Sequence, residues 1–196
     1  MEVLGLGRPY PVTFAEAAEI IDEDGHGDAE GNPDGMARVY VSPELDGWTL
    51  IIGPWCDPSD AGRSDDVLRL CLALSTRYGQ AQAYYYGAQG DGSAWLVTEN
   101  GTALRRYCET GVAENAHLTL GAPLPLERSH RARLGLPTTW DEATESDEDE
   151  AEWKWEAFGL APEIAAALGV SPLTLTPDTP VTGRGLIAST RPATDL

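Results

Sequence analysis

The sequence predicts an α+β fold with a mostly antiparallel sheet of about five strands, helices on one face and a C-terminal helical extension. Apolar residues at helical spacing give way to short β-branched and aromatic runs. These runs come in pairs joined by turn residues, whereas a parallel sheet needs a helical crossover between strands. The predicted order is therefore α-β-β-α-β-β-β.

The first helix is predicted over residues 14–22. Thr13 and Glu16 have the spacing of a capping box, in which each side chain accepts a hydrogen bond from the backbone amide of the other residue. The apolar residues that recur at helical spacing, and that we expect to be buried, are Phe14, Ala17, Ala18 and Ile21.

A hairpin and a longer helix follow. Residues 36–41 and 48–53 are β-branched and aromatic, and the segment between them contains Pro and Asp-Gly, which favour a turn. The helix over residues 64–78 has Ser64 as its expected N-cap, two aspartates in its first turn and Gly79 at the left-handed position after its end.

Three further runs predict a meander at residues 81–87, 93–99 and 102–108. Asn100 and Gly101 join the last two runs, and this dipeptide favours a type I′ hairpin turn because both positions need a positive φ angle. The pairs predicted to lie opposite each other are Val97 with Leu104, Trp95 with Arg106, Leu96 with Arg105 and Ala94 with Tyr107. Each face of the hairpin would then carry an arginine.

The domain organisation is predicted from a change in charge. Residues 141–152 contain eight carboxylates, which repel one another and favour an extended, mobile linker. We therefore expect an α+β core domain at residues 1–140, an acidic linker at 141–152, and an extension at 153–196 that either docks on the core or does not.

Weaker patterns predict four short elements outside the main runs. They are a strand at residues 117–120, a turn of helix near Glu127, a helix at 162–168 with Pro at its start and Gly at its end, and a strand at 185–188.

Composition indicates a folded cytoplasmic protein. The 196 residues are 42% hydrophobic, which suits a chain with its own core. The N-terminal residues lack the features of a secretion signal, no apolar run is long enough to span a membrane, and three unpaired cysteines fit a reducing compartment. The net charge of −19 opposes direct binding to nucleic acid or anionic lipid and favours a basic protein partner.

No motif predicts a metal, a cofactor or a catalytic residue. The acidic, glycine-rich loop at residues 22–35 resembles an EF-hand loop, but neither frame supplies the carboxylate required at position 12. Calcium bound in an irregular geometry is the alternative to a solvated loop. Cys56 precedes a helix, where a nucleophilic thiol can lie, but no histidine is paired with it by a known spacing and the nearby acids would raise the pKa of its thiol.

The acidic block runs directly into the sequence WKWEAF, and this segment is the first candidate site. Negative charge can steer a basic partner while aromatic side chains anchor it. The alternative is that the aromatic residues pack on the core and the acids form a solvated spacer. The residues that we predict to bind a partner are Asp147, Glu148, Asp149, Glu150, Trp153 and Trp155.

These features lead to two functional hypotheses. The first is a non-catalytic interaction protein that binds a basic partner, as an inhibitor, an immunity protein or an accessory protein of another enzyme; mimicry of nucleic acid is a special case. The second is a small enzyme or ligand-binding domain with an aromatic pocket over the sheet and arginines that hold an anionic group. The residues expected to line that pocket are Tyr84, Tyr86, Trp95, Arg105, Arg106 and Tyr107.

Overall fold

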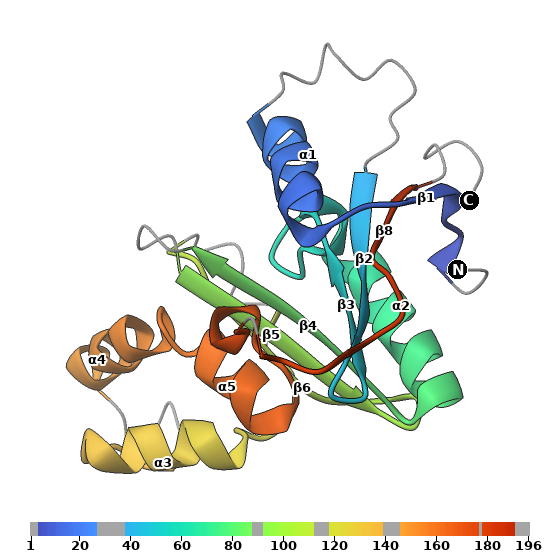
Figure 1. Cartoon of the computed structure of the whole chain (residues 1–196). Coiled ribbons are helices and arrows are strands. Elements are labelled where there is room, and N and C mark those ends of the chain that lie inside the picture. The colour runs from blue at the N-terminus through green and yellow to red at the C-terminus, as the bar shows by residue number, and fades with distance from the viewer. Residues whose placement is uncertain are drawn as a thin grey trace. The chain divides into compact units, whose positions relative to one another are not determined.

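The computed structural model describes residues 4–26, 38–87, 92–111, 118–138, 146–176 and 178–190. It confirms the α+β class, because helices are combined with antiparallel sheets (Figure 1). The chain forms two compact units, residues 1–56 with 175–196, and residues 57–174. Residues 153–174 thus lie in the second unit with the predicted meander, and residues 178–190 lie in the first.

The first unit joins the two ends of the described chain in one sheet. Its strands follow the order β1-β8-β2-β3, and β7 also pairs with β2. All of these pairings are antiparallel. The elements are β1 (Gly7–Pro11), α1 (Phe14–His26), β2 (Arg38–Leu45), β3 (Trp48–Ile52), the short 3-10 helix η3 (Pro54–Cys56), β7 (Val181–Thr182) and β8 (Leu186–Ser189).

The predicted first hairpin is present as β2 and β3. Asp46 and Gly47 form its turn with φ angles of 49° and 82°, so the turn needs the left-handed conformation that Asp-Gly readily adopts. Between β2 and β1 lies β8, whose Ile187 and Ala188 are fully buried. The single five-stranded sheet predicted from local runs is therefore wrong, because a C-terminal strand completes a separate first sheet.

Helix α1 begins with the predicted capping box. The Thr13 amide donates to Glu16 Oε2 at 2.7 Å, and the Glu16 amide donates to Thr13 Oγ1 at 3.2 Å. Ala17 is buried, whereas Ala18 is exposed and Phe14 is 56% exposed. The prediction that Phe14 is buried is wrong: its ring makes a T-shaped contact with the Tyr40 ring, with the centroids 5.8 Å apart, and more than half of the residue stays accessible to solvent.

The second unit places helices on both faces of a three-stranded antiparallel sheet with the order β4-β5-β6. The helix α2 packs Val67 and Cys71 on one face, against Leu96. On the other face, Trp95 packs with residues of α4 and α5, so the prediction of helices on one face is wrong. The elements are α2 (Ser64–Tyr78), β4 (Gln80–Gly87), β5 (Gly92–Glu99), β6 (Thr102–Glu109), α3 (Pro125–Arg133), α4 (Asp147–Ala157), α5 (Ala161–Leu168) and the 3-10 helix η5 (Pro172–Thr174).

The hairpin of β5 and β6 has the predicted turn but a different register. Asn100 and Gly101 have φ angles of 48° and 78°. An irregularity follows in β6, so that Val97 pairs with Arg105 instead of Leu104. One inserted residue on one strand exchanges the faces of the residues beyond it. The observed pairs are therefore Trp95 with Tyr107, Leu96 with Arg106, and Ala94 with Cys108.

Two helix starts differ from their predictions. Ser64 does not cap α2; the N-cap is Arg63, which makes no side-chain capping hydrogen bond. Residues 147–152 of the predicted extended linker are helical and belong to α4. Acidic side chains in a first turn interact favourably with the positive end of the helix dipole, and this opposes their mutual repulsion. Residues 141–145 lie outside the described residues.

Candidate functional site

The acidic start of α4 is fixed by a capping box. Ser146 Oγ accepts from the Asp149 amide at 3.2 Å, and Asp149 Oδ2 accepts from the Ser146 amide at 2.9 Å and from its hydroxyl at 2.8 Å. These hydrogen bonds lower the pKa of Asp149 below its ordinary value. The first turn consists of Asp147, Glu148, Asp149 and Glu150.

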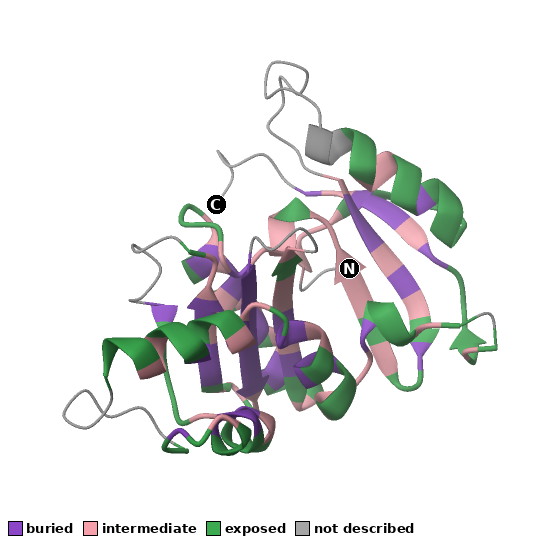
Figure 2. Cartoon of the chain, turned by 90° about the vertical axis from the view of Figure 1, so that its left-hand side faces the viewer, coloured by how far each residue is buried: buried purple, intermediate pink, exposed green. Residues whose placement is uncertain are grey.

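Trp153 attaches α4 to the sheet. It is 5% exposed, its ring lies 6.1 Å from the Tyr107 ring, and the Arg131 guanidinium lies 5.1 Å from its centroid. Ala157, one turn later, is fully buried. This side of the helix therefore forms part of the core of the second unit. Figure 2 colours the buried residues of the chain purple.

Trp155 has the opposite environment. Two helical steps rotate a side chain by about 200° around the axis, so Trp155 lies on the other side of the helix from Trp153. It is 78% exposed, and its ring centroid is 5.9 Å from that of Phe158. Of the two aromatic residues assigned to partner binding, one is core and one is surface.

Close side-chain contacts connect α4 to the neighbouring helices α3 and α5. His130 Nδ1 lies 2.5 Å from Glu156 Oε1, and its Nε2 lies 3.3 Å from Glu163 Oε2. Arg133 Nη2 also contacts Glu156 Oε1, at 3.1 Å. At the end of α4, the Ser93 hydroxyl donates to the Phe158 carbonyl at 2.6 Å. The helix thus has several side-chain links that restrict its position.

Three of the aromatic residues assigned to the alternative ligand pocket lie in the core instead. Trp95 is fully buried and stacks on Tyr107 with ring centroids 4.7 Å apart. Tyr84 packs against the same cluster, which includes Leu160 and Ile164 of the helical layer. Burial raises the pKa of both tyrosines above the ordinary value. Tyr86 lies apart from this cluster and is partly exposed.

The two arginines assigned to that pocket lie on opposite faces of the sheet. Arg105 shares the face of Trp95, and its Nη2 lies 2.6 Å from the fully buried Glu127 Oε1. Arg105 Nη1 also donates to the Gly121 carbonyl at 2.9 Å. Arg106, on the other face, lies 3.7 Å from Asp65, and its Nε and Nη2 have no partner among the described residues. The structure does not bring the arginines together.

Glu127 is a buried residue whose role the sequence did not indicate. Its Oε2 accepts from the Trp95 indole at 3.3 Å and from the Leu124 amide at 2.8 Å, in addition to the contact with Arg105. Glu127 is the third residue of a helix that starts with Pro, and this local position favours its hydrogen bond to the Leu124 amide. Its partners Trp95 and Arg105 are 32 and 22 residues away in the chain, so no local spacing predicts them.

The cysteines and the acidic loop are the remaining groups that the sequence offered for chemistry. Burial raises the pKa of Cys71 to about 12 and that of Cys108 to about 11, so both thiols are protonated at neutral pH. Cys56 is half-buried in η3. The loop at residues 22–35 lies outside the described residues from position 27 onward. Within the described part of the chain, no cluster of three or more His, Cys, Asp or Glu side chains has the geometry of a metal site.

No family model, curated protein or solved structure matches this chain. Among the described helices, none combines the length and the apolar character needed to cross a membrane.

Proposed function

We propose that this chain is a non-catalytic cytoplasmic interaction protein that binds a basic protein partner through the exposed side of α4, as an inhibitor or immunity-type protein or as an accessory protein of another enzyme. The observation that carries the proposal is the exposed Trp155 on an acidic helix. A tryptophan is usually buried to a large extent, and here 78% of it is accessible to solvent.

The proposal combines an aromatic anchor with electrostatic steering. Tryptophan is enriched among the residues that dominate binding energy at interfaces. The chain has a net charge of −19, and four consecutive acids begin the helix that carries Trp155. Complementary charge accelerates encounter with a basic surface and makes binding dependent on salt.

The attachment of α4 supports a preorganised surface. Trp153 and Ala157 pack into the core, and His130 Nδ1 contacts Glu156 Oε1. A binding residue on an already ordered helix loses less conformational entropy on association than one on a flexible tail. The core contacts of α4 thus favour the helix as a binding surface.

Affinity capture from native lysate at low salt tests this function. Wild-type protein is compared with Trp155→Ala and with Tyr78→Ala, a control that removes another exposed aromatic residue, on α2. We expect a stoichiometric basic protein with the wild type and Tyr78→Ala, and its loss with Trp155→Ala or at high salt. Failure to recover such a partner, or equal recovery with Trp155→Ala, would contradict the proposal.

A further inference from the structure

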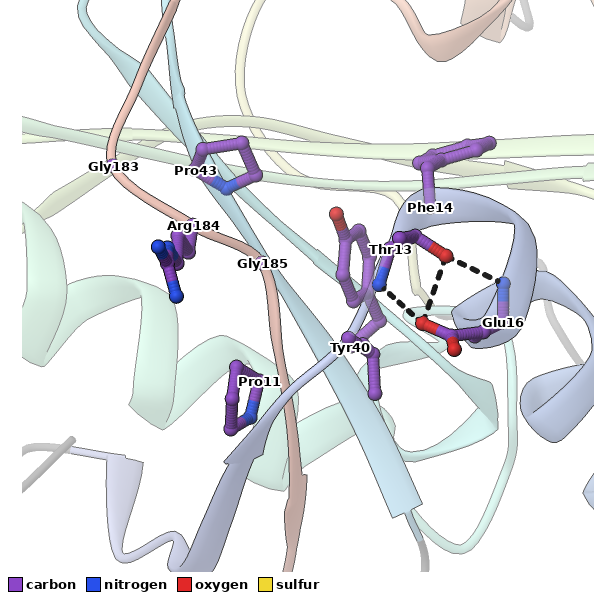
Figure 3. A pocket seen from close by; sticks show the side chains of 10 residues that line it. Pro11, Thr13, Phe14, Glu16, Tyr40, Pro43, Gly183, Arg184 and Gly185 are labelled. Atoms are coloured by element: carbon purple, nitrogen blue, oxygen red, sulfur yellow. Dashed lines mark hydrogen bonds between the residues drawn. The ribbon is translucent and has the colours of Figure 1, made fainter.

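An open surface cavity of about 490 Å³ lies in the first unit (Figure 3). Its volume is within the range of roughly 300–1,000 Å³ that is common for small-molecule sites. Most of its lining is apolar, from Pro11, Val12, Phe14 and Pro43. Segments from both ends of the chain contribute, because residues 183–185 form another part of the wall.

Tyr40 provides a polar group in this apolar lining. The residue is only 3% exposed, and its hydroxyl has no hydrogen-bond partner among the described residues. Burial raises the pKa of Tyr40 above its ordinary value, so the hydroxyl is protonated and can donate a hydrogen bond. The hydroxyl oxygen itself is not fully enclosed, so a ligand in the cavity can reach it and accept this hydrogen bond.

Gly185 allows the Tyr40 ring to occupy this position. A Cβ atom added at Gly185 would lie 2.4 Å from the Tyr40 hydroxyl oxygen and 2.6 Å from a ring carbon. Since Gly185 is buried, a side chain there would displace the ring. The shape of the cavity and the position of its hydroxyl therefore depend on this glycine.

Arg184 provides the positive charge at the cavity. Its exposed guanidinium forms no hydrogen bond or ion pair with the described residues, although acids outnumber lysine and arginine by 32 to 13 in the chain. Figure 3 draws Arg184, Pro11 and Pro43 on one side of the Tyr40 ring, and Glu16 on the other.

Glu16 is the other charged residue in the lining. Its Oε2 accepts from the Thr13 amide and hydroxyl, and these bonds lower the pKa of the carboxyl group. The ionised Glu16 repels an anion from its side of the cavity, so an anionic group is favoured at Arg184.

We propose that this cavity binds a small apolar carboxylic acid. The carboxylate pairs with Arg184 and accepts from the Tyr40 hydroxyl, and the hydrocarbon part packs against Phe14 and the two prolines. Arginine is suited to this role because its planar fork can donate two parallel hydrogen bonds to a carboxylate. The residues that line this cavity belong to the first unit, and none of them is in α4.

The test is titration of the full-length protein with phenylacetate, 3-phenylpropionate and octanoate, followed by two-dimensional amide NMR. The neutral amide of each acid is the matched control ligand. We expect at least one acid to shift resonances of cavity residues with a dissociation constant in the millimolar range, and its amide to bind about tenfold more weakly. The proposal is overturned if no acid shifts these resonances at about 10 mM, or if acid and amide bind equally.

Two variants separate the contributions of the polar groups. Arg184→Gln should weaken binding of the acid about tenfold and leave binding of the amide unchanged, because only the charge contact is lost. Tyr40→Phe should weaken binding of the acid by about three- to tenfold. Arg8→Gln, at an exposed arginine of β1 outside the lining, should match the wild type. Acid binding unchanged in Arg184→Gln would overturn the proposal.

Discussion

Trp153 and Trp155 are two tryptophans, two positions apart, that have different environments. The first is packed between the Tyr107 ring and the Arg131 guanidinium, and the second is 78% exposed. The composition of the segment identified both as candidate anchors. Their division follows from the direction of α4 relative to the sheet, which depends on contacts distant in sequence.

Because Trp153 is buried and Trp155 is exposed, their substitutions should have very different effects on the free energy of unfolding. Trp153→Ala should lower the free energy of unfolding by about 3–5 kcal/mol, because it leaves a cavity in the core. Trp155→Ala should change it by no more than about 0.5 kcal/mol. Urea denaturation followed by circular dichroism measures both values, and comparable losses for the two variants would contradict the placement of α4.

Glu127 is the other residue whose substitution is informative. Glu127→Ala should cost about 3–5 kcal/mol, because Arg105 would remain buried without its counter-charge. Glu19→Ala, at an exposed position of α1, is the control and should change stability by less than about 0.5 kcal/mol. Denaturation curves for the two variants test the buried pair of Arg105 and Glu127. A decrease in the free energy of unfolding of less than about 1 kcal/mol for Glu127→Ala would argue against this pair.

At the scale of one element, the capping box of α4 makes its first turn dependent on pH. Hydrogen bonds from Ser146 lower the pKa of Asp149 below the ordinary 3.8. Because the folded pKa is depressed, the stabilisation is complete above the ordinary value and is lost as the pH falls through the lowered one. We expect the helix start to fray in this acidic window.

Carbon-13 NMR of the Asp149 carboxyl group measures this effect. The wild-type carboxyl should titrate below 3.8, and in Ser146→Ala its pKa should rise toward that value. The variant should also lose about 1 kcal/mol of helix stability, with faster amide exchange in the first turn. Identical titration curves for the two proteins would show that the capping box does not form.

Local signals predicted the elements better than their arrangement. Thr13 with Glu16 and Asn100 with Gly101 specify backbone conformation within a few residues, and both features are present. The irregularity between Ala103 and Arg105 has no comparable signal, and it moved Arg105 to the face of Trp95. The two arginines lie on opposite faces, as predicted, but one residue of register decides that Arg105, and not Arg106, shares the face of Trp95.

The acidic block illustrates a different error. Its charge density favoured an extended linker, but Ser146 and Asp149 form a capping box and Trp153 is buried. The capping box could have been predicted, because Ser146 and Asp149 are only three residues apart in the chain. The burial of Trp153 could not have been predicted locally, because it depends on Tyr107 and Arg131.

At the scale of the whole molecule, the C-terminal segment completes the first unit. Its β8 lies between β1 and β2, and Ile187 is fully buried against Tyr40 and Ala17. No local pattern indicates that a strand near residue 187 pairs with strands near residues 10 and 40. This is why the sequence predicted one sheet and a separate extension.

Removal of residues 175–196 should therefore damage the first unit selectively. The remaining strands would lose the partner that lies between them, whereas residues 57–174 keep their own core. Amide NMR of the truncated chain should show collapsed dispersion for β2 and β3 and retained dispersion for β4–β6. Retention of native shifts in β2 would contradict the observed strand order.

The proposed contact of exposed Trp155, on the acidic helix α4, with a basic partner is tested most directly by isothermal titration. The captured partner is titrated against wild type, Trp155→Ala and Tyr78→Ala, at low and high salt. We predict that Trp155→Ala weakens binding by about tenfold or more, that Tyr78→Ala has no effect, and that added salt weakens wild-type binding. Equal affinities for wild type and Trp155→Ala, or affinity independent of salt, would contradict the claim.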